Sequence, residues 1–98
     1  MLSIPSFRAK VYTKRQMAFT VYMLKCADQS LYIGYTKDIE KRVHAHNSLK
    51  SGARYTKQRR PVSLVYSESY KTLRAALKRE YALKQLTREQ KLNLLQER

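Results

Sequence analysis

The sequence predicts a small α+β, sandwich-like domain in which a three-stranded antiparallel sheet is flanked by helices, in the order ββαβαα. Its 98 residues suffice for one modest hydrophobic core and leave little room for a second. Three short runs are rich in β-branched and aromatic residues, as strands are. The segments after the second and third runs carry apolar residues at the three- and four-residue spacing of amphipathic helices.

The first two predicted strands form a hairpin. Residues 19–26 (FTVYMLKC) and residues 31–36 (LYIGYT) have strand composition, and the polar residues 27–30 form the turn between them. Gly34 interrupts the second strand, which indicates a bulge or a close approach of another group to the backbone. Residues 62–67 (VSLVYS) alternate in polarity and form the third strand.

Helical patterns occupy most of the remaining chain. Helices are predicted over residues 37–48, 72–86 and 88–96. Thr72 can cap the second helix, and Thr87 and Gln90 have the spacing of a capping box at the start of the third. Residues 49–61 (LKSGARYTKQRRP) form a basic loop punctuated by glycine and proline.

The charge of the chain favours a polyanionic partner. Lysine and arginine number 21 against 7 acidic residues, a net charge of +14 at pH 7. Nucleic acid is the favoured partner because the basic residues are spread along the whole chain. The alternatives are an anionic membrane surface and a merely soluble basic domain. No stretch has the roughly 18 apolar residues of a spanning helix.

Cysteine usage and the N-terminus indicate a cytoplasmic protein. Cys26 is the only cysteine, so no internal disulfide is possible, and one cysteine with two histidines excludes a Cys-rich zinc site. Residues 1–17 are basic and lack the apolar core of a signal peptide. We predict that they are a loosely ordered extension of a domain that spans residues 18–98.

One carboxylate falls on an apolar helix face. In the predicted helix 72–86, the apolar face is formed by Leu73, Ala76, Leu77, Tyr81 and Leu83. Glu80 lies in the middle of that face with Lys84 beside it. Burying an unpaired carboxylate costs several kcal/mol. Glu80 must therefore be paired, hydrogen-bonded, bound to a cation, or placed at the lip of a cleft.

The first predicted helix carries two histidines that face different ways. With Ile39 at the centre of the buried face, His46 lies about 20° from that centre and His44 about 140° from it, at 100° per residue. His44 should be solvated, whereas His46 should face the sheet beside Arg42. The alternative is that Arg42 snorkels at the edge and His46 is a hydrogen-bonded core residue.

Tyr22 and Tyr32 lie on the hairpin strands, where tyrosine commonly serves packing. They share a face only if paired residue numbers have an even sum, which requires an odd-length turn or a bulge. We predict that arrangement. The two tyrosines, the inward Arg–His pair and the carboxylate then fall on three elements that must pack together in so small a domain.

These residues resemble the motifs of the GIY-YIG nuclease superfamily. Residues 20–22 (TVY), followed after nine residues by residues 32–34 (YIG), are similar to its paired tripeptides. Arg42, His46 and Glu80 stand where that family has its Arg, its His or Tyr, and its metal-binding Glu.

The resemblance covers about residues 18–94 and is strongest to the small single-domain bacterial proteins of the UPF0213 group. Two positions depart from the family pattern. Residues 20–22 read Thr-Val-Tyr rather than Gly-Ile-Tyr, with the tyrosine retained. Several family nucleases carry a Lys shortly after the second tripeptide, and Lys37 is the candidate for that role here.

The resemblance implies a divalent-metal-dependent endonuclease. Tyr32 would orient or deprotonate the attacking water, and Arg42 would clamp the phosphate. His46 would share protons with the water or with Tyr32, and Tyr22 would position the network. Glu80 is the only acid predicted to face the interior, so a single Mg²⁺ or Mn²⁺ is the most that the sequence supports.

Substrate binding would come from basic residues around that site. The candidates are Lys37, Lys50, Arg54, Tyr55, Lys57, Arg59, Arg60 and Lys84. The cations suit phosphates and Tyr55 suits stacking on a base. We expect DNA rather than RNA, branched or single-stranded, in DNA repair or processing. The alternative is a catalytically weak nucleic-acid-binding module in which Glu80 only pairs with Lys84 or Arg42.

Overall fold

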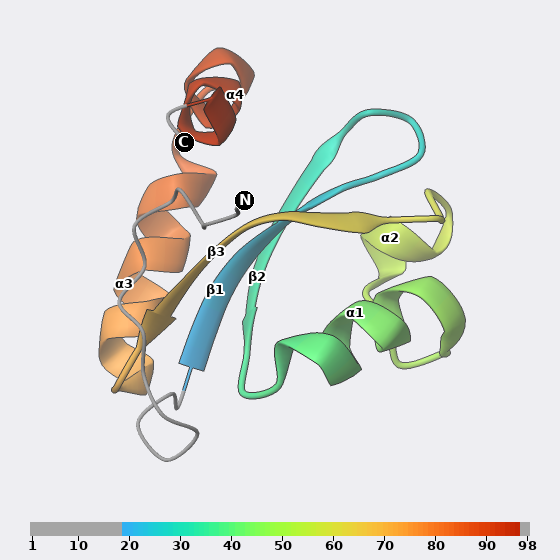
Figure 1. The fold of residues 1–98 in the computed structure, drawn as a ribbon, viewed down its shortest axis with the longest axis horizontal. Helices are drawn as coiled ribbons and strands as arrows, with labels where there is room; N and C mark the ends of the chain where they lie inside the picture. Colours follow the sequence, from blue (N-terminus) through green and yellow to red (C-terminus); the bar gives the residue numbers. More distant parts are fainter. Residues whose placement is uncertain (1–18, 97–98) are drawn as a thin grey trace, which may run out of the picture.

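The computed structural model describes residues 19–96, and the extension predicted for residues 1–17 lies outside this range. The sheet contains three antiparallel strands in the spatial order β2-β1-β3, namely β1 (Phe19–Lys25), β2 (Leu31–Thr36) and β3 (Ser63–Tyr70). Figure 1 shows β1 between its two neighbours. The predicted α+β class and the order ββαβαα are confirmed, with one additional short helix.

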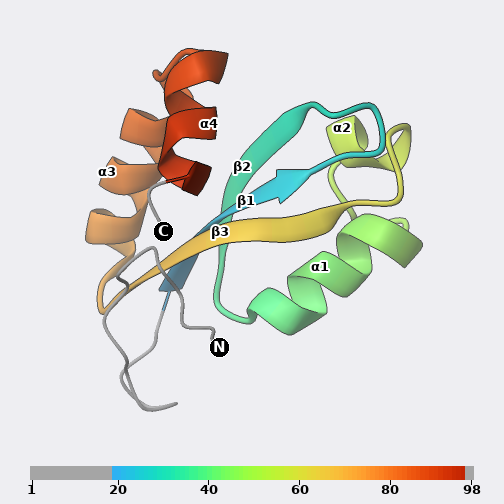
Figure 2. The same cartoon turned by 45° about the horizontal axis from the view of Figure 1, so that its top comes forward.

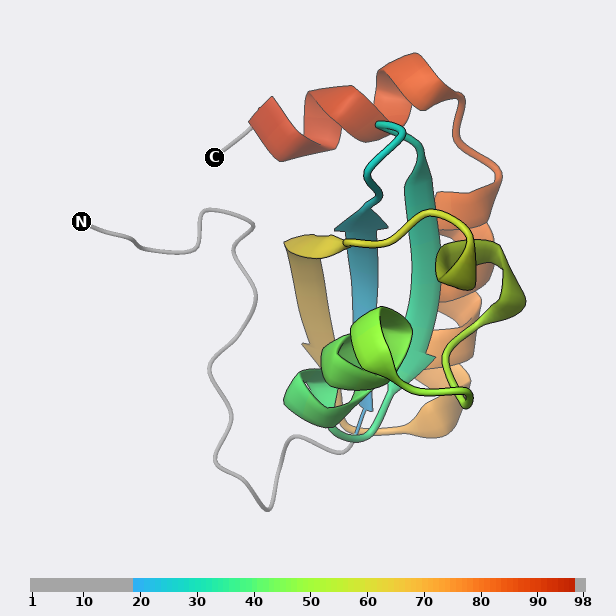
Figure 3. The same cartoon turned by 90° about the vertical axis from the view of Figure 1, so that its right-hand side faces the viewer.

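Helices cover both faces of the sheet. They are α1 (Ile39–Ser48), the single-turn α2 (Arg54–Lys57), α3 (Leu73–Lys84) and α4 (Arg88–Gln96). Figures 2 and 3 show α1 and α2 on one side of the sheet and α3 on the other. The helix α2 falls within the segment predicted as a loop. None of the helices in residues 19–96 is both long and apolar enough to cross a membrane.

The connection between β1 and β2 determines which side chains share a face. The two strands pair as far as Lys25 and Leu31, so residues 26–30 form an odd-length connection. The prediction of an odd-length turn is confirmed. Paired residue numbers have even sums, and Tyr22 and Tyr32 therefore project from the same face of the hairpin.

Each face of the sheet carries its own apolar cluster. The cluster on the α3 side is built on Val21, Met23, Ile33, Tyr66, Ala76 and Leu83. The cluster on the α1 side contains Tyr22, Leu24, Cys26 and Val62, with Tyr32, Ile39 and Val43 packed against it. Strand alternation divides β1 between the two, since its odd-numbered residues face α3 and its even-numbered residues face α1.

Side chains cap the starts of three helices, as predicted for α3 and α4 and in addition at α1. The side chains of Asp38 and Thr72 accept hydrogen bonds from the backbone N–H groups three residues later, at 3.2 and 3.1 Å. Thr87 and Gln90 form the predicted capping box, because each backbone N–H donates to the other's side chain, at 2.9 and 3.1 Å.

The buried face of α3 differs from the predicted one. Ala76 and Leu83 are buried, as predicted, but Leu73 and Leu77 are about 40% exposed and Tyr81 is 68% exposed. The small Ala76 side chain lets the helix backbone approach the sheet. With Ala76 and Leu83 at the contact, the larger Leu73, Leu77 and Tyr81 side chains turn towards solvent.

The prediction that Glu80 is the only acid facing the interior is wrong, because Glu68 also faces inward. The Glu68 side chain on β3 is 12% exposed, less than the 16% of Glu80. Arg79 donates to both Glu68 oxygens, at 2.8 and 3.1 Å, and the hydroxyls of Tyr66 and Tyr70 donate to one oxygen each. Burial favours the neutral acid, but these four donors outweigh it and hold the pKa of Glu68 below its ordinary value.

We expect Glu68→Gln to lower the free energy of unfolding by about 2–4 kcal/mol at pH 7, because it leaves the Arg79 guanidinium without its anionic partner. Urea unfolding measures the change, and Glu40→Gln, an exposed acid on α1, is the matched control. The difference from wild type should shrink at acid pH as Glu68 itself becomes protonated. A loss below about 0.5 kcal/mol, the range of surface substitutions, would contradict this account.

Candidate active site

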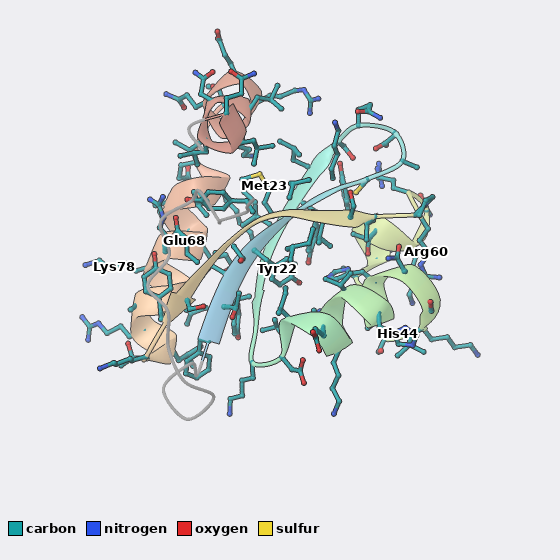
Figure 4. The ribbon with its side chains drawn as sticks, in the orientation of Figure 1. Tyr22, Met23, His44, Arg60, Glu68 and Lys78 are labelled. Atoms are coloured by element: carbon teal, nitrogen blue, oxygen red, sulfur yellow. The ribbon has the colours of Figure 1, made fainter. Side chains whose placement is uncertain are left out.

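Tyr22 and Tyr32 form the floor of the candidate site. Their ring centroids lie 6.4 Å apart on the face of the sheet that α1 covers. Figure 4 shows Tyr22 on the α1 side of the sheet and Glu68 on the α3 side. Gly34, directly opposite Tyr22 on β2, makes this packing possible, since a Cβ there would lie 2.7 Å from the Tyr22 hydroxyl oxygen. The close approach predicted at Gly34 is confirmed.

His46 packs against both tyrosines from α1. Its Nε2 lies 2.8 Å from the Tyr22 hydroxyl, and its ring meets Tyr22 and Tyr32 edge-on at centroid distances of 5.7 and 5.1 Å. His46 is fully buried, whereas His44 is exposed. The predicted orientations of the two histidines are confirmed.

Arg42 lies one helical turn before His46 on α1 and is half-buried. Its Nη1 donates to the backbone carbonyl of Ser51 at 3.0 Å, which holds the guanidinium in place. Burial raises the pKa of Tyr22 to about 12, and the positive charge of the Arg42 guanidinium opposes that rise. Tyr22 is therefore a neutral phenol at pH 7, and Arg42 is the cation whose charge acts on it.

Glu80 lies on α3, on the other side of the sheet from α1 (Figure 3). Its negative charge makes the weakest of the contributions to the pKa of Tyr22. Lys84, itself 52% exposed, pairs with one Glu80 oxygen at 3.4 Å. Within residues 19–96 this is the one ion pair of Glu80, and no three His, Cys, Asp or Glu side chains come together. The donor set fits a divalent ion held by one carboxylate, with water completing the shell.

Lys37 lies at the edge of an open hollow next to Arg42. The hollow runs along α1 beside the end of β2, and Lys41 and Leu49 also line it. The Lys37 ammonium group stands 5.6 Å from the centroid of the Phe19 ring. Lys37, Lys41 and Arg42 therefore line this hollow together with Asp38, and their charges suit a phosphate backbone.

The basic loop divides into residues that hold the protein together and residues that face solvent. Arg60 donates to three carbonyls at the end of α1, those of Ala45, His46 and Leu49, at 2.6 to 3.2 Å. Arg59 pairs with Asp28 at 3.0 Å. Both arginines were predicted as phosphate contacts, but both have partners within the protein. Their positions in the sequence do not indicate these internal contacts.

The Arg59 guanidinium also lies over the Tyr55 ring, 3.8 Å from its centroid. Tyr55 in turn stacks on Tyr32 at 5.9 Å. An aromatic and cationic stack therefore stands over one of the two site tyrosines. Lys50, Arg54 and Lys57 remain exposed and free to meet a polyanion.

Thr56 belongs to the site although no sequence pattern indicated it. Its side chain is fully buried, and its hydroxyl lies 2.7 Å from His46 Nδ1. Thr56 stands between Tyr55 and Lys57, both exposed, in a segment with no regular periodicity, so no local pattern marks it as a core residue. Only the contact with α1 reveals its place.

We expect stability to fall below pH 6.5 because of His46. Burial, reinforced by the charges of Arg42 and Arg60, lowers the pKa of His46 from 6.5 to about 4. The unfolded chain therefore binds a proton at this position between about pH 6.5 and 4, while the folded protein does not. The stabilisation is complete above pH 6.5 and is lost as the pH falls towards 4, on the order of 2 kcal/mol.

Urea unfolding between pH 7.5 and 4 measures this loss. His46→Gln should flatten the profile, and His44→Gln, which removes the other histidine, is the matched control. A wild-type profile that His46→Gln leaves unchanged would contradict the assignment.

The structure is thus a three-stranded antiparallel sheet with Tyr22 and Tyr32 on one face and His46 packed against both from α1. The family pattern described as the GIY-YIG catalytic domain matches residues 18–93. The chain belongs to the GIY-YIG family, whose members are nucleases that generally depend on a divalent metal.

Relatives place the chain within a subgroup of that family. It is 60% identical over 77 residues to a UPF0213 protein of Staphylococcus epidermidis, which covers 79% of this chain and 93% of the relative. It is 58% identical over 78 residues to a UPF0213 protein of Staphylococcus aureus, covering 80% and 94%.

Two solution NMR structures are also similar. A UPF0213 protein from Bacillus halodurans shares 37% identity, with a TM-score of 0.53 over 80% of this chain and 82% of that one. A protein from E. faecalis shares 38% identity, with a TM-score of 0.52 over 76% and 80%. The predicted resemblance to the GIY-YIG superfamily and the UPF0213 group is confirmed.

Proposed function

We propose that this protein is a divalent-metal-dependent endonuclease that hydrolyses phosphodiester bonds in DNA. The observation that carries the proposal is the convergence of Tyr22, Tyr32, Arg42 and His46 on one face of the sheet, within the electrostatic reach of Glu80. Membership in a nuclease family supports this reading. A cytoplasmic location and a role in DNA repair or processing are parts of the same proposal.

The two tyrosines have different hydrogen-bonding states. The Tyr22 hydroxyl is held by His46, whereas the Tyr32 hydroxyl makes no hydrogen bond within residues 19–96. Tyr32 is therefore the tyrosine whose hydroxyl can meet a water molecule. We assign it the orientation of the attacking water and assign Tyr22 the positioning of Arg42 and His46 around it.

Arg42 and Glu80 supply the charges that phosphodiester hydrolysis requires. The Arg42 guanidinium retains donors beyond the one used by Ser51, and a planar fork of donors suits two phosphate oxygens. Glu80 would hold Mg²⁺ or Mn²⁺, which when bound polarises the phosphate and stabilises the leaving 3′-oxygen. The Arg42 guanidinium would stabilise the negative charge that grows on the phosphate in the transition state.

The exposed cations would bind the sugar-phosphate backbone. Lys50, Arg54 and Lys57 project from the loop next to Tyr55, and Lys37 and Lys41 line the hollow beside Arg42. Together they flank the tyrosine site. Contacts of this kind bind without reading sequence, which favours single-stranded or branched DNA chosen by shape.

The alternative function is a nucleic-acid-binding module with little catalysis. The Glu80–Lys84 pair favours it, because a carboxylate already paired with a lysine can have a purely structural role. The two functions differ in their need for metal. Backbone binding requires only low salt, whereas hydrolysis by the proposed site requires a divalent ion.

Cleavage of labelled DNA and RNA tests the proposal. Single-stranded, duplex and branched substrates are incubated with the protein in Mg²⁺, in Mn²⁺ and in chelator, and binding is measured in parallel at low and high salt. Metal-dependent cleavage of DNA is the expected result. Salt-sensitive binding with no cleavage in either metal would replace the nuclease with the binding module, and cleavage confined to RNA would change the substrate class.

A further inference from the structure

A chain of hydrogen bonds continues behind the Tyr22–His46 pair into the basic loop. His46 uses both ring nitrogens, Nε2 with the Tyr22 hydroxyl at 2.8 Å and Nδ1 with the Thr56 hydroxyl at 2.7 Å. The Thr56 hydroxyl also lies 3.0 Å from the backbone carbonyl of Ala53. Tyr22, His46 and Thr56 are all fully or almost fully buried, so water does not compete for these bonds.

The Ala53 carbonyl fixes the direction of the chain at one end. A carbonyl can only accept, and two oxygens 3.0 Å apart repel unless a proton lies between them. The single proton of the Thr56 hydroxyl is therefore donated to Ala53. The Thr56 oxygen then has only lone pairs to offer His46, so Nδ1 must carry the proton of that bond.

The tautomer fixes the direction at the other end. A neutral imidazole with its proton on Nδ1 has only a lone pair at Nε2, so Nε2 must accept. The Tyr22 hydroxyl, 2.8 Å from Nε2, is therefore the donor of that bond. The Tyr22 proton points to His46, and the Tyr22 oxygen keeps its lone pairs for other donors.

We propose that Thr56 is a positioning residue of the site, whose hydroxyl holds His46 in the tautomer protonated on Nδ1 and so makes Nε2 the acceptor for Tyr22. The proton order runs from Tyr22 to His46, from His46 to Thr56 and from Thr56 to Ala53. Through this chain the fold of the basic loop sets the hydrogen-bonding state of the tyrosine on β1.

The consequence for chemistry rests on the proposed nuclease function. With its proton committed to His46, Tyr22 presents only lone pairs to Arg42 and the site. Without the Thr56 hydroxyl, His46 is free to carry its proton on Nε2 and donate to Tyr22, which would send the phenol proton towards Arg42 and disturb the phosphate clamp. Hydrogen-bond partners that orient metal-ligating histidines change activity by about 10- to 100-fold, and we expect an effect of that order from Thr56.

The test is the tautomer of His46 in the full-length protein without substrate. The chain has two histidines, so long-range ¹H–¹⁵N correlation spectra of ¹⁵N-histidine-labelled protein contain two rings, and His44→Gln assigns them. Three proteins are compared at pH 7: wild type, Thr56→Val, which keeps the shape without the hydroxyl, and Thr56→Ser, which keeps the hydroxyl. Amide dispersion establishes that each is folded.

We expect an Nδ1-protonated His46 in wild type and Thr56→Ser, and loss of that state in Thr56→Val. An Nε2-protonated ring in wild type overturns the inference, and so does a Thr56→Val spectrum that still shows Nδ1 protonated. Should Thr56→Val not fold, the wild-type spectrum decides by itself, because the inference stands or falls with its tautomer.

Steady-state kinetics supply the second readout. Thr56→Val should lower kcat about 10- to 100-fold with KM changed little, and Thr56→Ser should restore it. An inactive wild-type protein with Nδ1-protonated His46 would refute the proposed function and leave this inference standing. An active protein with the other tautomer would do the reverse.

Discussion

Replacing Glu80 with Gln is expected to abolish metal-dependent cleavage while leaving the fold intact. Glutamine keeps the shape of the side chain but offers a neutral amide where a divalent ion requires a carboxylate. The loss of metal stabilisation should cost several kcal/mol in the transition state, at least about 1,000-fold in kcat/KM.

The fold should not suffer, because the contacts of Glu80 are weak. Its pairing partner Lys84 is 52% exposed, and such a pair four residues apart on a helix is worth about 0.3–0.5 kcal/mol. Glu68→Gln offers a contrast, since its carboxylate has four internal donors. Glu80→Gln should remove activity and leave stability nearly unchanged, whereas Glu68→Gln should lower stability.

Cleavage rates and urea unfolding are measured on the same preparations. Glu89→Gln, an exposed acid on α4 outside the site, is the matched control. If Glu80→Gln retains metal-dependent cleavage, Glu80 does not hold the metal, and the proposal of a single ion bound by Glu80 is refuted. A loss of activity that follows unfolding would give Glu80 a structural role instead.

The arrangement of the site was predictable from the sequence where the pattern is local. The alternation of β1 and β2 fixes the side of Tyr22 and Tyr32 once the turn length is known, and helix geometry separates His46 from His44. A glycine such as Gly34 within a strand predicts that another group approaches the backbone closely, because a strand interior normally carries a side chain. Each of these predictions depends only on residues close together in the sequence.

Contacts between distant segments were not predictable in the same way. Glu68 and Arg79 meet from β3 and α3, and nothing in an alternating strand indicates which polar residue will find a partner across a helix. Thr56 is buried only because the loop folds back on α1. Arg60 likewise turns from an apparent phosphate contact into a cap for the carbonyls of α1. Long-range packing decides all three cases.

Replacing Gly34 with Ala is expected to damage both stability and the site. The added Cβ would lie 2.7 Å from the Tyr22 hydroxyl oxygen, 2.9 Å from its Cζ and 3.2 Å from Cε2 of Tyr32. Tyr22 cannot easily yield, because its ring is 1% exposed and its hydroxyl is bonded to His46. Overpacking of this kind costs about 1–3 kcal/mol.

The hydrogen bond between Tyr22 and His46 is the contact that should give way. A double-mutant cycle with Tyr22→Phe isolates this effect, since phenylalanine removes the hydroxyl oxygen nearest to the new Cβ and frees the ring from His46. Gly34→Ala should therefore cost less in the Tyr22→Phe background, by about 1 kcal/mol or more. Urea unfolding of the four proteins measures the coupling. Equal costs in both backgrounds would mean that β2 moves as a whole and that Gly34 does not hold Tyr22 in place.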